Sequence, residues 1–217
     1  MKRLHTQNQL QDFLDAELSW RVKEISALKS AVKSSAVISE QTLVRASVAL
    51  LYAHWEGFIK SAATGYVTYV NNQGLNYSEL KTCFVVLGFK KALHDVQQSK
   101  QSHVNATLID FLRNGLDRKS KLKIDTAINT ESNLSASVFE NILHAVGFET
   151  TPYESKANLI NESLLKRRNT IAHGEYIDVS KDDWAKLADE VLQMLRQFKT
   201  DIENAMALSS FKQLATE

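Results

Sequence analysis

Glycine and proline are scarce in this chain of 217 residues, which contains seven glycines and one proline. β-Sandwiches and barrels need many tight turns and usually contain more of both residues. Hydrophobic residues make up 44% and charged residues 24%, which is ordinary for a globular chain and excludes a disordered one. We therefore expect an all-α fold, a single-domain antiparallel helical bundle with additional short helices that extends over residues 1–217.

Cysteine and net charge are scarce as well. The one cysteine, Cys83, excludes an internal disulfide and a cysteine-rich zinc site, and its apolar surroundings indicate a small buried residue. With 26 basic and 25 acidic residues the net charge is +1, so a contact with nucleic acid has to come from a local patch. The N-terminal residues do not resemble a signal peptide, and the apolar runs are too short to span a bilayer. These absences predict a cytoplasmic protein with no membrane partner.

Apolar residues recur at spacings of three and four along most of the chain, which is typical of amphipathic helices. We expect helices near residues 7–34, 39–70, 78–96, 106–116, 137–146, 158–173 and 180–205, and loops near 97–102 and 129–133. Thr6 and Ser180 are followed three residues later by Gln9 and Asp183, so both are expected to form capping boxes.

The last expected helix contains a seven-residue repeat of apolar positions. The repeat consists of Trp184, Ala188, Val191, Leu195, Phe198, Ile202 and Ala205. Such a repeat is typical of a core helix in an antiparallel bundle and also of a dimer interface, and both interpretations stay open. Trp20, Trp55 and Trp184 lie on apolar helix faces and are expected in the core.

One charged residue lies where a plain core helix would have an apolar one. An apolar arc of the helix near residues 158–173 consists of Ile160, Leu164, Leu165, Ile171 and Ala172. In an ideal α-helix Arg168 lies near the middle of this arc. Desolvating an unpaired guanidinium costs at least several kcal/mol, so Arg168 needs either a buried ion-pair partner or a bound ligand.

His173 follows Arg168 in the last turn of the same helix, and Gly174 is the expected left-handed cap. The negative end of the helix dipole favours a protonated imidazole there. Asn169 lies one turn before His173 and is expected to orient its ring. A guanidinium beside a titratable imidazole can bind a phosphate and move a proton without a metal.

The segment from Arg168 to His173, RNTIAH, matches the Arg-x(4–6)-His signature of ribonucleases of the HEPN superfamily, including the Asn that commonly follows the Arg. Residues 43–58, LVRASVALLYAHWEGF, also resemble the MAE-type HEPN-like nuclease family. The likeness covers residues 43–198, and the motif-bearing region of the domain extends from about 39 to 208.

The resemblance implies a metal-independent endoribonuclease with no cofactor, often the toxin of a toxin–antitoxin pair or an anti-phage defence effector. It also implies an RNA substrate, an antitoxin protein as a partner, and a homodimer in which two Arg/His pairs meet across a two-fold cleft. One subgroup carries a modified Tyr two residues after the His. Here Glu175 occupies that position and Tyr176 comes one residue later, so regulation by tyrosine modification is not expected.

A homodimer also answers a geometric problem. On a straight helix Arg168 and His173 point about 140° apart, so one protomer does not easily aim both at one phosphate. Two copies related by a two-fold axis allow these groups to converge.

Supporting residues are expected on the second helix. Arg45, Tyr52 and Glu56 lie along one edge of its apolar stripe, at spacings of seven and four. Glu56 is the candidate partner of Arg168 in a bidentate ion pair. The alternative is an exposed helix edge with local pairing.

A run of basic residues lies earlier in the chain. Between residues 113 and 123 there are five basic residues and one acidic residue. This run is either a solvated face or a surface that contacts RNA phosphates outside the cleft, through Arg118, Lys119, Lys121 and Lys123. Arg167, beside the apolar arc, is expected to act in the same way.

Two functions are consistent with these patterns. The first is an endoribonuclease in which His173 moves the proton and Arg168 stabilises the charge on phosphorus. The second is a non-catalytic helical RNA- or protein-binding regulatory module, in which Arg168 has a structural role.

Overall fold

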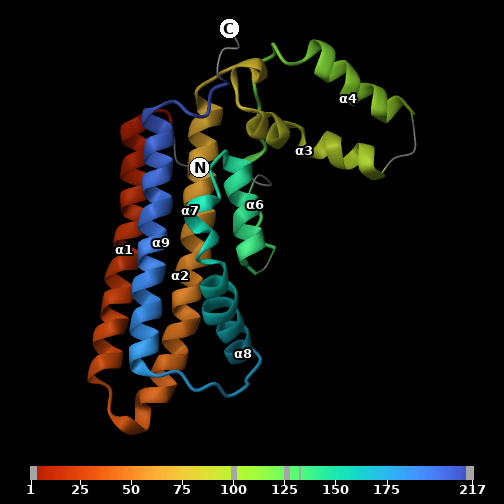
Figure 1. Ribbon diagram of the computed structural model, residues 1–217. Coiled ribbons are helices and arrows are strands. Elements are labelled where there is room, and N and C mark those ends of the chain that lie inside the picture. The colour runs from red at the N-terminus through yellow and green to blue at the C-terminus, as the bar shows by residue number, and fades with distance from the viewer. Residues whose placement is uncertain (1–3, 99–101, 125–127, 132, 214–217) are drawn as a thin grey trace.

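The computed structural model describes residues 4–98, 102–124, 128–131 and 133–213. Three long helices, α1 (Gln7–Ser34), α2 (Val37–Asn72) and α9 (Lys181–Ala207), pack side by side along most of their lengths (Figure 1). Since the described residues form helices and two isolated β-bridges but no strand, the all-α prediction is confirmed.

The remaining described helices are arranged in two groups around α2 (Figure 1). One group lies beside α2: α6 (Ala136–Val146), the π-helix η2 (Leu159–Lys166) and α8 (Arg167–Ala172) contact it, and the short helix α7 (Thr151–Glu154) lies between α6 and η2 in the chain. The other group follows the C-terminal end of α2: the 3₁₀ turn η1 (Tyr77–Glu79), α3 (Thr82–Gln98) and α4 (Ser102–Asn114). Helix α8 therefore lies near one end of the bundle, and the α3–α4 hairpin extends from the other.

Side chains at the two expected capping sites behave differently. At Thr6 both bonds of the capping box form, because Gln9 Oε1 reaches back to the Thr6 backbone N–H. At the start of α9, Ser180 Oγ accepts from the Asp183 backbone N–H at 3.0 Å, and this is the one half of the box that is present. The carboxylate of Asp183 is one methylene shorter than that of glutamate, so the prediction of a complete second box is wrong.

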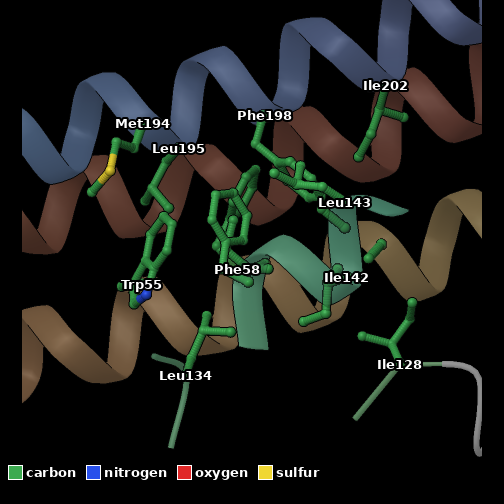
Figure 2. Packing of buried hydrophobic residues seen from close by; sticks show 14 of the residues in the cluster. Trp55, Phe58, Ile128, Leu134, Ile142, Leu143, Met194, Leu195, Phe198 and Ile202 are labelled. Carbon is green, nitrogen blue, oxygen red and sulfur yellow. The ribbon is translucent and has the colours of Figure 1, made fainter. Parts of the chain in front are cut away.

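The core joins α2 and α9 to α6 (Figure 2). Trp55 and Phe198 are fully buried, and both rings meet the ring of Phe139 edge-on, at centroid distances of 4.9 and 5.8 Å. All seven members of the heptad repeat in α9 are buried within the chain. The repeat is therefore that of a core helix, and its apolar positions are not available for a dimer interface.

Trp20 is an exception among the tryptophans, since 47% of its surface is exposed. Its ring lies 4.3 Å from the guanidinium carbon of Arg21 and meets the His54 ring edge-on at 5.3 Å. The prediction that Trp20 is a core residue is wrong. Trp20 lies at the edge of the apolar face of α1, where it covers the side chains of Arg21 and His54 instead of entering the core.

Two further sequence-based expectations concern Cys83 and membranes. Cys83 is half-buried, and burial raises the pKa of its thiol, which disfavours the reactive thiolate. Among the described helices, none combines the length and apolarity that crossing a membrane requires.

The first prediction concerns the core of α9. Replacing Phe198 with Ala removes a fully buried ring and should lower the free energy of unfolding by about 3–5 kcal/mol. The control is Gln193→Ala, at an exposed position on the same helix. This substitution should change the free energy of unfolding by less than about 0.5 kcal/mol. Urea denaturation followed by circular dichroism measures both, and equal midpoints for the two variants would contradict this packing.

The second prediction concerns His54, which is 3% exposed and has Nε2 3.1 Å from Glu24 Oε2. Burial lowers its pKa below the ordinary value of 6.5; the neighbouring Glu24 opposes this shift and Arg21 adds to it. Below pH 6.5 the unfolded chain therefore binds this proton more readily than the folded chain does. The free energy of unfolding should fall as the pH decreases from 6.5 toward 5, and His54→Gln should reduce this slope. An unchanged slope in the variant would assign the pH dependence to other groups.

Candidate active site

The helix that carries Arg168 and His173 changes type just before the motif. Residues Leu159–Lys166 form the π-helix η2, and α8 then begins at Arg167. A π-helix has more residues per turn than an α-helix, so the angular positions calculated for an ideal α-helix do not apply beyond Leu159. Ile160 and Leu164 are buried as predicted, but Ala172 is exposed, so the predicted apolar arc is wrong at its far end.

Arg168 is half-buried between α2 and the loop that precedes α6. Its guanidinium carbon lies 4.0 Å from the centroid of the Tyr52 ring, a stacked cation–π geometry. Its Nη2 donates a hydrogen bond to Asn133 Oδ1 at 2.9 Å. Two elements far apart in the chain therefore orient this guanidinium.

Tyr52 is itself held in place, because its hydroxyl accepts a hydrogen bond from the Leu134 backbone N–H at 2.6 Å. The side chain is 3% exposed. Burial raises the pKa of the hydroxyl above its ordinary value of 10, and the hydrogen bonds with Leu134 and Arg168 only partly oppose this effect. Tyr52 is therefore a neutral phenol at neutral pH and a fixed apolar surface beneath Arg168.

Glu56 lies one turn after Tyr52 on α2 and is half-buried. Among the ion pairs of the described residues, none joins Glu56 to Arg168, so the predicted bidentate pair is wrong. The reason is that the guanidinium stacks on the Tyr52 ring, one turn away, and donates to Asn133 instead. The negative charge of Glu56 does act on Tyr52, where it contributes to the raised pKa.

Arg45 contacts the turn that follows α8. Its Nη2 donates a hydrogen bond to the Glu175 backbone oxygen at 2.9 Å, and its guanidinium carbon lies 5.6 Å from the centroid of the Tyr176 ring. Its Nε is buried and has no hydrogen-bond partner within the described part of the chain. Arg45 thus connects α2 to the backbone two residues after His173.

His173 is the C-cap residue of α8, and its side chain is exposed. The helix ends in a Schellman turn: Gly174, at φ 79°, donates to the Ile171 carbonyl at 3.1 Å, and the Glu175 N–H donates to the Thr170 carbonyl at 3.0 Å. The Asn169 carbonyl accepts from the His173 backbone N–H at 2.9 Å. The backbone at His173 is therefore well defined, and the imidazole points into solvent at the end of α8.

The structure separates the expected RNA-binding residues from these groups. Arg167 lies on the other side of the helix and lines a groove with Asp183 and Lys186 near the start of α9. Lys119 and Lys121 lie beside the C-terminal end of α2, where the next residue, Leu122, donates its N–H to Asn71 Oδ1 at 2.8 Å. At 1.5 Å per residue, Asn71 is about 28 Å along α2 from Tyr52.

Asn133 was missed from the sequence. It lies in the polar stretch 129–133, whose composition indicates only a loop, and it precedes Arg168 by 35 residues. No periodic pattern relates an isolated loop asparagine to a helix so far along the chain. Within the described residues, no group of three or more His, Cys, Asp or Glu side chains is placed to hold a metal ion.

Comparison with known protein families gives one match. The model of the family described as RiboL-PSP-HEPN matches residues 16–204, so the chain belongs to this family. The predicted membership of the HEPN superfamily is therefore confirmed, and the matching branch is RiboL-PSP-HEPN. No curated protein and no solved structure matched the chain.

The third prediction tests the support beneath Arg168. Replacing Tyr52 with Phe keeps the ring but leaves the buried Leu134 N–H without its acceptor, which should lower the free energy of unfolding by about 1–3 kcal/mol. Tyr176→Phe, at a position that is 71% exposed, should change it by less than about 0.5 kcal/mol. Thermal and urea denaturation compare the two variants. If the Tyr52→Phe variant is as stable as wild type, the prediction is wrong, and the Leu134 N–H finds another acceptor.

Proposed function

We propose that the chain is a metal-independent endoribonuclease in which Arg168 and His173 act on one phosphodiester, with a dimer bringing two such pairs to a shared cleft. The observation that carries the proposal is the arrangement at α8. Arg168 is oriented by Tyr52 and Asn133, and His173 is exposed at the end of the same short helix. Five residues of α-helix correspond to about 7.5 Å along the axis and about 140° around it, so the proposal needs the dimer to bring both kinds of side chain to one phosphate.

The proposed reaction is an internal transesterification. The 2′-oxygen bonds to phosphorus, the bond from phosphorus to the 5′-oxygen breaks, and the products carry a 2′,3′-cyclic phosphate and a 5′-hydroxyl. One imidazole removes the proton from the 2′-hydroxyl, and a second, His173 of the partner subunit, protonates the leaving 5′-oxygen. Arg168 stabilises the negative charge that develops on the phosphoryl oxygens.

Other residues support these groups in the proposal. Arg45 holds the turn after His173 through the Glu175 carbonyl, and Tyr52 holds Arg168. Asn169 contributes its carbonyl to the helix end. Membership of the RiboL-PSP-HEPN family supports a ribonuclease or a related function. The cellular role as a toxin or anti-phage defence effector, restrained by an antitoxin, is part of the same proposal.

The fourth prediction is made for purified protein and total RNA in the presence of a chelator. Wild type should cleave RNA to 2′,3′-cyclic phosphate ends. His173→Ala should lose about 10²–10⁴-fold in rate, and Arg168→Ala about 10²–10³-fold. The matched control is Arg196→Ala, because this exposed arginine on α9 belongs to none of the expected RNA contacts and the variant should retain activity within a few-fold. Equal activity in all four proteins would reject the assignment of Arg168 and His173.

One observation favours the second candidate, a non-catalytic RNA- or protein-binding module. Arg168 already contacts Tyr52 and Asn133, as a purely structural arginine would. Expression in a bacterial host separates the two functions. An active ribonuclease toxin should arrest growth, and His173→Ala should relieve the arrest while leaving the circular dichroism spectrum unchanged. If Arg168→Ala unfolds the protein and His173→Ala has no effect on growth, the binding module is the better description.

A further inference from the structure

In the segment after α4, exposed and buried side chains alternate from one residue to the next, which does not occur in the helices. Lys119, Lys121 and Lys123 are exposed, whereas Ser120 and Leu122 between them are buried. Side chains of an extended backbone alternate between two faces, so the three lysines point to the same side, at intervals of about 6.6–6.8 Å. We call these three residues the lysine row.

The backbone beneath the lysine row is fixed by residues around η1. Asn76 and Lys119 form an antiparallel bridge, and the Ser120 N–H donates to the Leu75 carbonyl at 2.9 Å. The Tyr77 hydroxyl accepts from the Lys121 N–H at 3.0 Å. An otherwise irregular segment is therefore held extended, and the lysine row is pre-organised.

Within the described part of the chain, the positive charge of the lysine row is not neutralised by ion pairs. None of the ion pairs between described residues includes Lys119, Lys121 or Lys123. Arg118, beside the row, is also exposed. The one acidic residue of the run, Asp117, accepts a hydrogen bond from Ser78 Oγ at 2.9 Å. The surface therefore presents cations at regular spacing, which suits a polyanion with regularly spaced charges.

We propose that the lysine row binds the phosphates of an extended, single-stranded stretch of the RNA substrate, at a place separate from the cleft. The spacing of the lysines is close to that of successive phosphates along one nucleic-acid strand. An extended single strand can follow the straight row at all three lysines, whereas a strand of a duplex curves away from it along a helical path. This inference rests on the proposed ribonuclease function for the identity of the polyanion. Since Asn71, beneath the row, is about 28 Å along α2 from Tyr52, only an RNA long enough to span that distance uses both sites.

The test measures binding and cleavage separately. The probe for binding is a single-stranded RNA with 2′-O-methyl groups throughout, which has no 2′-hydroxyl for the proposed reaction. The variant is Lys119→Gln, Lys121→Gln and Lys123→Gln combined. The control combines Lys23→Gln, Lys33→Gln and Lys60→Gln, three exposed lysines on α1 and α2. Fluorescence anisotropy at several salt concentrations gives the affinity and its salt dependence.

The lysine-row variant should bind the probe about tenfold more weakly than wild type, and the slope of log affinity against log salt should decrease by about two units. The control variant should match wild type. Cleavage of a trinucleotide, which is too short to reach the row, should be the same in both variants and in wild type. An unchanged affinity in the lysine-row variant, or an equal loss in the control, overturns the proposal.

Two further outcomes are decisive. The duplex form of the probe tests the preference for a single strand. If the duplex binds wild type as tightly as the single strand does, and its affinity falls by as much in the lysine-row variant, the single-stranded preference is wrong. If the variant loses binding to phosphatidylserine vesicles but keeps its affinity for the probe, the row is a membrane contact instead. Because the 2′-O-methyl probe is not cut, its measured affinity does not depend on whether the protein cleaves RNA. A failure of Arg168 and His173 as catalysts would appear in that assay alone.

Discussion

The contact between Tyr52 and Arg168 is the interaction on which the candidate active site depends. Tyr52 belongs to α2, which packs against α1, α9 and α8, and its side chain is buried. Its hydroxyl orders the loop before α6, and its face supports the guanidinium. A charge that is oriented before substrate binds needs little reorganisation in the transition state, which is how electrostatic stabilisation becomes effective.

The amide of Asn133 gives Arg168 a neutral acceptor within the protein. A phosphate oxygen carries charge and is a stronger acceptor than an amide oxygen. In the proposed reaction the phosphate therefore competes with Asn133 for the same guanidinium, and the loop before α6 is directly coupled to occupancy of the site. The side chain of Arg168 is oriented by contacts within the protein, whereas that of His173 is not held in the same way. The Schellman turn orders the backbone of His173, and its ring faces solvent.

Most of the fold could be predicted from the sequence, because it follows from local periodicity and capping. The bounds of α1 and the buried face of α9 agree with the expectations, since Thr6 caps one helix and seven regularly spaced apolar residues define the other. The pairing of Arg168 and His173 on one late helix was also visible, from their spacing and from Gly174. What could not be predicted depends on tertiary contacts. Trp20 lies at the edge of a face, and Asn133 meets Arg168 only through folding.

The expected pair between Glu56 and Arg168 shows the same limitation. Both residues were placed on suitable helix faces, but the faces were calculated for ideal α-helices. Once η2 changes the number of residues per turn, Arg168 is rotated relative to that calculation, and it stacks on Tyr52 instead of reaching the next turn of α2. Composition and spacing carry no clear signal for a π-helix, so this error could not be avoided from the sequence.

The π-helix also has an evolutionary consequence. A π-helical turn holds about one residue more than an α-helical turn, so this segment can lose that residue by becoming a regular helix, and the residues after it keep nearly the same direction. Arg168 and His173 lie beyond η2, on α8 and at its C-cap, where the loss of one residue between them rotates everything after it by about 100°. Related chains can therefore vary in length at residues 159–166 without re-aiming the pair, whereas the spacing between Arg168 and His173 has no such freedom.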